Sequence, residues 1–192
     1  MLTASGGDFL EVEEPACGEI YARIPISTTL EVDQAVDAAL DAFEGWSNRS
    51  PSERSDWLQK LANGIEKNHE KLSWAESRDT GKPISLASKL DIPRAASNLR
   101  FFAGAILHNN SQVHHTDHRI MNYTNRLPLG VVGCISPWNL PLYLFTWKIA
   151  PALATGNCVI AKPSELTPYT AYMLAKICVE IGFPAGVLNI LH

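Results

Sequence analysis

Apolar positions in the first hundred residues recur at the spacing of helices. Thr28 and Glu31 match a capping box, and the apolar residues between 32 and 43 lie three and four positions apart, with Gly45 as a predicted stop. Residues 50–53 repeat the start signal with a serine, a proline and a glutamate. The apolar stripe of this second helix consists of Trp57, Leu58, Leu61 and Ile65.

Two further helical stretches follow. One covers about residues 70–79 and ends at Gly81. The other covers residues 83–102, where Pro93 is expected to kink or restart the helix. The first hundred residues are therefore predicted to be mainly helical.

Extended segments flank these helices. Short strands are predicted at residues 9–12 and 20–24, whereas the polar residues 108–116 are predicted to form a loop. Residues 119–126 alternate between two faces, which indicates a half-exposed strand. An uncovered strand edge favours pairing with another segment or another subunit, and the sequence does not identify which.

From residue 131 short apolar strands alternate with helices. Strands are predicted at residues 131–135, 158–161 and 187–191, and helices at residues 140–154 and 168–181. Uncharged strands joined by helices are typical of a parallel sheet covered on both faces, with right-handed crossovers. The predicted fold class is therefore α/β, a helical N-terminal region followed by a Rossmann-like parallel β-α-β-α-β half.

The composition indicates a globular protein, with 46% hydrophobic residues among 192. The formal net charge is −4 and no basic residues cluster, which excludes nucleic acid as a partner. Residues 127–147 carry no charge and are long enough to span a bilayer. Prolines and glycines within them free backbone groups that lipid cannot satisfy, so no membrane span is predicted.

The four cysteines show no close pairing, and the first residues lack the charged and apolar regions of a signal peptide. A cytoplasmic location with reduced thiols is therefore predicted. Cys134 lies in an apolar strand with no histidine placed to activate it, so all four cysteines are interpreted as packing residues. The histidines between residues 108 and 118 fit no metal-binding spacing, and no metal is predicted.

Two loops carry the candidate chemistry, Ser-Pro-Trp-Asn at residues 136–139 and Lys-Pro-Ser-Glu at residues 162–165. Each follows an apolar strand and precedes a helix, which is where open α/β sheets bind their ligands. No GxGxxG motif occurs in the chain. A carboxylate at Glu165 can accept both hydroxyls of a ribose, while Lys162 reaches another hydroxyl or a phosphate. A solvated loop is the simpler interpretation of the same spacing.

Asn139 has two interpretations as well. Its side-chain amide suits a donor that faces a developing oxyanion. Asparagine is also a common helix cap, and the chemistry of the residue alone favours that role. Trp138 either lines a pocket or fills the core.

Four sequence blocks point to a known family. They are RLPLGVVG from Arg126, ISPWNLPL from Ile135, KIAPALATGN from Lys148 and AKPSELTP from Ala161. In their order and spacing the chain resembles the aldehyde dehydrogenase superfamily, from about residue 15 to its end. The resemblance implies the N-terminal portion of that fold.

The resemblance also implies roles for the two loops. Asn139 would be the oxyanion-hole amide, which acts on the thiohemiacetal formed when a cysteine attacks the aldehyde, and this implication overrides the helix-cap interpretation. Lys162 and Glu165 would hold the adenosine ribose of the cofactor. Glutamate at position 165 favours NAD, because the 2′-phosphate of NADP would meet like charge. The residues implied to line the cofactor channel are Ile135, Ser136, Pro137 and Trp138.

Residues 138–148 look most like the branch that oxidises 2-aminomuconic or hydroxymuconic semialdehydes. Arg100 and Trp147 are candidates to contact the acid end of such a substrate. The resemblance further implies an N-terminal cofactor-domain part at residues 1–118, a strand of a bridging and oligomerisation element at 119–127, and a Rossmann-like segment at 128–192.

Family members are much longer, and their nucleophilic cysteine, general-base glutamate and most of the catalytic domain lie beyond the part that resembles this chain. The full-length form is expected to be a homo-oligomer that oxidises an aldehyde to a carboxylic acid. The 192-residue chain alone is expected to be inactive. The alternative is a non-catalytic product that binds nucleotide or pairs with full-length subunits.

Overall fold

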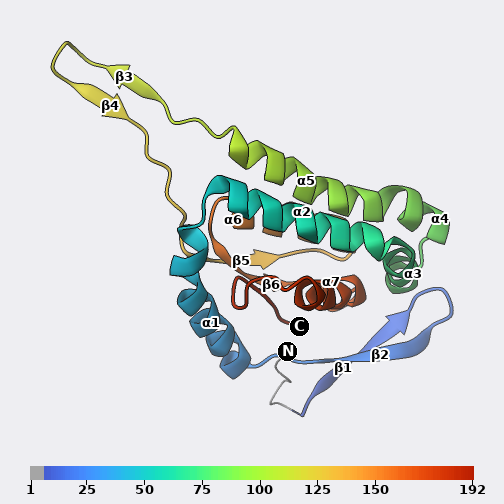
Figure 1. Cartoon of the computed structure of the whole chain (residues 1–192). Coiled ribbons are helices and arrows are strands. Elements are labelled where there is room, and N and C mark those ends of the chain that lie inside the picture. The colour runs from blue at the N-terminus through green and yellow to red at the C-terminus, as the bar shows by residue number, and fades with distance from the viewer. Residues whose placement is uncertain (1–6) are drawn as a thin grey trace.

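The structure, a computed structural model, describes residues 7–192 of the chain (Figure 1). The prediction that no signal peptide is present rests partly on residues 1–6, which lie outside this range. The strands are β1 (Phe9–Glu14), β2 (Glu19–Pro25), β3 (Val113–His115), β4 (Met121–Tyr123), β5 (Val131–Ile135), β6 (Cys158–Lys162) and β7 (Leu188–Ile190). The helices are α1 (Thr29–Ser47), α2 (Pro51–Lys67), α3 (His69–Thr80), α4 (Ile84–Leu86), the π-helical turn η1 (Ala87–Asp91), α5 (Ile92–Leu107), α6 (Pro141–Ala154) and α7 (Tyr169–Glu180).

The β-α-β-α-β prediction is confirmed in the second half of the chain. Strands β5, β6 and β7 form a parallel sheet in that order, with Val131 opposite Cys158 and Val159 opposite Leu188. Helix α1 packs against all three strands, while α6 packs against β5 and β6. Apolar side chains of β6 are buried between these helices, which explains why the central strand carries no charge before Lys162.

The start of α1 is confirmed and its predicted stop is wrong. Thr28 and Glu31 form the capping box, with the Glu31 carboxylate accepting the Thr28 backbone N–H at 2.8 Å. The helix continues beyond Gly45 because Trp46 is buried in the core and its indole N–H donates to the carbonyl of Leu153 at 3.2 Å. Packing of this residue holds the last turn helical.

The buried face of α1 also differs from its apolar pattern. Ala35, Ala39 and Trp46 are buried, whereas Val32 and Leu40 are 41% and 57% exposed. Neighbouring elements cover only part of the apolar stripe, so spacing alone overestimated the buried face.

The helices α2, α5 and α6 form the centre of the helical core. The capping box at Ser50 is present, and Leu58, Leu61 and Ile65 are buried as predicted. Helix α3 ends at Gly81, also as predicted. Pro93 restarts the chain as a regular helix directly after the π-helical turn, because proline is tolerated in a first helical turn.

The exposed strand near residue 120 has a partner within the chain. Strand β4 pairs antiparallel with β3, so the prediction that residues 108–116 are entirely loop is wrong. The resulting hairpin projects from the body of the molecule (Figure 1), and Met121 and Tyr123 are 61% and 71% exposed. Among residues 7–192, no helix has both the length and the apolar content needed to cross a membrane.

Candidate functional site

The two loops singled out from the sequence leave the same edge of the parallel sheet. Ile135 at the end of β5 lies opposite Lys162 at the end of β6. The backbone N–H of Ser136 donates to the carbonyl of Lys162 at 3.1 Å, which ties the loops together where they leave the sheet. The structure therefore brings the two sequence motifs to one place, outside the carboxyl ends of parallel strands.

The first loop combines a buried anchor with an exposed tip. Ser136 is 5% exposed, whereas Ile135 and Trp138 are 72% and 58% exposed. Pro137 is exposed as well. Large apolar side chains in the open beside a polar loop are typical of a surface that a ligand or another part of a protein covers. Trp138 does not fill the core.

Asn139 is exposed, and its side chain forms no hydrogen bond with any other described residue. The N-cap of α6 is Leu140, and no side chain of that segment caps the helix. The helix-cap interpretation of Asn139 is therefore wrong. Its carboxamide is free to donate to a ligand oxygen at the start of α6.

The second loop presents a charged pair. The Lys162 Nζ lies 3.2 Å from Glu165 Oε2, and both side chains are about half exposed. The Glu165 backbone N–H, followed by the Lys162 ammonium, lowers the pKa of the Glu165 carboxyl below its ordinary value. The carboxylate is ionised at neutral pH and can accept hydrogen bonds from a diol, while it repels a phosphate.

Helices α6 and α7 begin within a few residues of these loops, and neither helix start has a side-chain cap from its own segment. Two carboxylates of α3 accept the backbone N–H groups at these helix starts instead. Glu76 Oε2 accepts the backbone N–H of Leu142 in α6 at 3.4 Å, and Asp79 Oδ2 accepts that of Tyr169 in α7 at 2.8 Å. Negative charge at a helix N-terminus is stabilising. One turn of α3 thus supports the starts of both helices.

Both carboxylates are buried. Burial raises the pKa of Glu76 to about 7, although the Lys82 ammonium at 3.9 Å opposes the shift. Burial also raises the pKa of Asp79 to about 6, against hydrogen bonds from the Tyr21 hydroxyl and the Tyr169 backbone. Lys82 is bound more closely by the buried Asp91, at 2.6 Å. These groups form a buried polar layer behind the two loops.

Sequence reasoning missed Glu76 and Asp79. On a helix, acidic residues three positions apart normally face solvent, and nothing local shows that this face is covered. The available signal was indirect: the starts of α6 and α7 have no serine, threonine, asparagine or aspartate in a capping geometry. A partner for their N–H groups had to come from elsewhere in the chain.

The cysteines Cys134, Cys158 and Cys178 are buried or partly buried, and none of the three is activated as a nucleophile. Burial raises the pKa of the Cys134 thiol, and it raises the pKa of Cys158 to about 11 and of Cys178 to about 12. These three fit the predicted packing role. Cys17 contradicts that prediction because it is exposed in the turn between β1 and β2.

Of the two candidates for substrate contact, Arg100 is already hydrogen-bonded within the protein, and Trp147 is half exposed. The Arg100 guanidinium on α5 donates to Gln59, Asn63 and Glu66 of α2, at 2.5 to 3.1 Å. Trp147 is 48% exposed and lies edge-on to the ring of Phe102. Trp147 is therefore better placed than Arg100 to meet a ligand.

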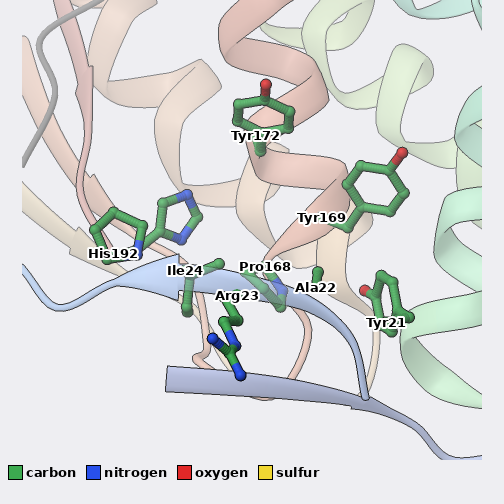
Figure 2. Close-up of a pocket in the computed structure, with 9 residues that line it drawn as sticks. Tyr21, Ala22, Arg23, Ile24, Pro168, Tyr169, Tyr172 and His192 are labelled. Carbon is green, nitrogen blue, oxygen red and sulfur yellow. The ribbon is translucent and has the colours of Figure 1, made fainter. Parts of the chain in front are cut away.

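Two cavities lie outside the predicted site. One of about 320 Å³ lies between β2 and the start of α7, with Tyr169 and Tyr172 on one side and Arg23 on the other (Figure 2). The other, of about 420 Å³, lies between α2, the end of α5 and the stem of the hairpin. Neither is lined by a site residue predicted from the sequence. In the described range, no group of three or more His, Cys, Asp or Glu side chains is arranged to hold a metal ion.

Comparison with known proteins identifies what the chain is similar to. The profile of the aldehyde dehydrogenase family matches residues 2–192. The 2-aminomuconic semialdehyde dehydrogenase of Bos taurus is 54% identical over 183 residues, which cover 95% of this chain and 38% of that protein. The 2-hydroxymuconic semialdehyde dehydrogenase of Pseudomonas sp. (strain CF600) is 45% identical over 195 residues, covering 99% of this chain and 40% of that protein.

Solved structures give the same result for the fold. PnpE from Pseudomonas sp. WBC-3 superposes with a TM-score of 0.94 at 40% identity, covering 99% of this chain and 39% of the PnpE chain. A structure of PnpE in complex with nicotinamide adenine dinucleotide superposes equally well, with a TM-score of 0.94. The chain thus spans about two fifths of the length of the proteins it matches, and its fold is the N-terminal portion of theirs.

Proposed function

The chain belongs to the aldehyde dehydrogenase family, and on that premise we propose that it carries the oxyanion donor and part of the cofactor site of an NAD-dependent aldehyde dehydrogenase. The observation that carries this proposal is the junction of the two loops, where the Ser136 N–H binds the Lys162 carbonyl at 3.1 Å. Loop 136–139 and loop 162–165 thereby form one surface. The polar groups that this surface presents are the free Asn139 amide and the charged pair of Lys162 and Glu165.

Asn139 donates its side-chain N–H to the substrate oxygen as negative charge develops there. The amide is exposed and has no partner among residues 7–192, so no protein hydrogen bond must break before it acts. Removing one such donor commonly costs 100-fold or more, on the order of 3 kcal/mol, in related chemistry. NAD, when bound, would accept the hydride released from the substrate.

Glu165 and Lys162 would hold the adenosine ribose. The Glu165 carboxylate would accept hydrogen bonds from the two ribose hydroxyls, and the Lys162 ammonium, which lies beside Glu165, would donate to one of them. Ile135, Pro137 and Trp138 supply an exposed apolar surface next to this pair, and Ser136 fixes the loop. These features fit NAD better than NADP, because the 2′-phosphate would face the Glu165 carboxylate.

The substrate class follows from the similar proteins. Relatives from Bos taurus and Pseudomonas are named for 2-aminomuconic and 2-hydroxymuconic semialdehydes. We therefore propose a muconic semialdehyde, which is oxidised to the carboxylic acid.

We also propose that residues 1–192 alone do not turn over aldehyde. The raised pKa values of Cys134, Cys158 and Cys178 keep these thiols protonated, and none adjoins a base in the described range. Incubation of the purified chain with NAD and a muconic semialdehyde is expected to give no increase in absorbance from NADH. Cysteine-dependent NADH formation would contradict this part of the proposal.

Cofactor binding is tested by calorimetric titration of the chain with NAD and with NADP. NAD is expected to bind weakly, and at least about tenfold more tightly than NADP, a difference of about 1.4 kcal/mol. Glu165→Gln should reduce this preference, while Glu180→Gln, a change on α7 outside the predicted site, should leave it unchanged. Equal affinity of the wild-type chain for NAD and NADP would contradict the role of Glu165.

A second candidate function is non-catalytic pairing with full-length subunits. The hairpin of β3 and β4 favours it, because Met121 and Tyr123 are exposed on a projecting element (Figure 1). Co-purification of the tagged chain with an intact family member tests this function, with Met121→Lys and Tyr123→Lys as disrupting variants. If the double variant were retained as well as the wild type, the hairpin would not be the pairing element.

A further inference from the structure

We propose that Glu76, a residue of α3 distant in sequence from both loops, is a positioning residue for Asn139. The inference rests on the proposed function, since it assigns Asn139 the oxyanion role. Glu76 does not reach the surface on which substrate and cofactor would bind, because its side chain is completely buried. It acts through the first turn of α6.

The first turn of α6 depends on Glu76 for its backbone hydrogen bonding. Pro141 at the first helical position has no N–H, and Leu142 at the second is fully buried. Among residues 7–192, the Leu142 N–H bonds only to Glu76 Oε2, at 3.4 Å. No local side chain replaces this contact. Glu76 therefore fixes the position at which α6 begins.

Asn139 lies three residues before Leu142, with only Leu140 and Pro141 between them. Upstream, Ser136 is held to Lys162, as described above. The loop that carries Asn139 is thus fixed at two points, the sheet edge through Ser136 and the start of α6 through Leu142. Loss of the Leu142–Glu76 hydrogen bond would let the Asn139 amide leave its position, while the Ser136–Lys162 hydrogen bond stays in place.

The Lys82 ammonium lies beside Glu76 and helps to hold its carboxylate in place. Lys82 lies 3.9 Å from Glu76 and 2.6 Å from Asp91, so the ammonium is shared between two buried carboxylates. Of these two, only Glu76 accepts a hydrogen bond from α6. Asp91 therefore offers a matched control, a buried carboxylate of the same cluster that accepts no hydrogen bond from the start of α6.

The test uses nuclear magnetic resonance on the 192-residue chain, with Glu76→Met as the main variant. Methionine has similar length and no acceptor for the Leu142 N–H. In E76M the Leu142 amide should exchange with solvent at least about tenfold faster. The indole N–H of Trp138 and the side-chain amide of Asn139 should shift at the same time.

Two variants separate positioning from general destabilisation. Glu76→Gln keeps an acceptor oxygen and should restore the wild-type signals of Trp138 and Asn139. Asp91→Leu removes the other buried carboxylate and should leave those signals in place, even if it lowers the overall stability. If E76M does not fold, Glu76→Asp replaces it. The aspartate side chain is one methylene shorter, which moves the carboxylate away from the Leu142 N–H, and the same Trp138 and Asn139 signals are measured.

The proposal is overturned if the Trp138 and Asn139 signals stay unchanged in the folded Glu76 variant. It is also overturned if D91L shifts them to the same extent. None of these measurements uses cofactor or substrate. Failure of the chain to bind NAD would therefore contradict the proposed function, but it would not change the outcome of this test.

Discussion

Replacement of Gly186 by alanine should destabilise the chain more than any other glycine substitution at a turn of the β-α-β-α-β unit. Gly186 lies just before β7 and has φ of +75°, a conformation that side-chain-bearing residues rarely adopt. An added Cβ would lie 2.3 Å from the carbonyl oxygen of Ala38 and 2.9 Å from the Cβ of Ala42. Both contacts belong to α1, so relief requires the helix and the last strand to separate.

The expected magnitude has two parts. The left-handed conformation costs an alanine about 1–2 kcal/mol, and overpacking against α1 adds about 1–3 kcal/mol. Gly186→Ala should therefore lower the free energy of unfolding by roughly 2–5 kcal/mol. Such a loss is a large fraction of the stability of a typical domain.

A neighbouring glycine supplies the control. Gly182 has φ of +67°, but apart from its own atoms and its two chain neighbours, no described residue has a heavy atom within 4 Å of its added Cβ. Gly182→Ala should therefore cost only the conformational part, about 1–2 kcal/mol. Gly104 within α5 also has open space around it, and alanine there should stabilise the chain by about 0.5–1 kcal/mol.

Urea unfolding followed by tryptophan fluorescence measures all three variants. Trp46 reports on the relevant contact, because it is buried at the end of α1 and its ring lies 5.7 Å from that of Phe183. The expected order of stability is G104A, wild type, G182A and G186A. If G186A were no less stable than G182A, the close approach of β7 to α1 would be refuted.

Two further predictions concern the site. Asn139→Ala should change the free energy of unfolding by less than about 0.5 kcal/mol, because the amide is exposed and unbonded; a loss of about 1 kcal/mol in thermal or urea unfolding would restore the helix-cap role. Burial raises the pKa of Asp79 from 3.8 to about 6, so its protonated form stabilises the folded state below pH 4 and this stability is lost as the pH rises through 6. The D79N variant should lack this pH-dependent loss of stability. Between pH 4 and pH 7, the free energy of unfolding of D79N should therefore rise relative to that of the wild type by up to about 3 kcal/mol. A constant difference across this range would contradict the effect of burial.

Local signals in the sequence were sufficient for most elements. Thr28 and Ser50 each begin a helix because the cap and its glutamate lie within four residues of one another. The alternation of apolar strands with helices after residue 131 predicted a parallel sheet, because parallel neighbours need a long crossover connection, which is usually a helix. The four motif blocks were sufficient to indicate the family, whose profile matches residues 2–192.

The tertiary structure decided which faces are covered. Val32 and Leu40 are exposed although they match the apolar stripe of α1, while Glu76 and Asp79 are buried although they are acidic. Burial depends on what packs against a residue, and that neighbour is distant in sequence: Leu142 is 66 residues from Glu76, and Tyr169 is 90 residues from Asp79. Periodicity gives the direction of each side chain on its own helix, but the partner that makes a buried charge tolerable exists only once the helices are packed.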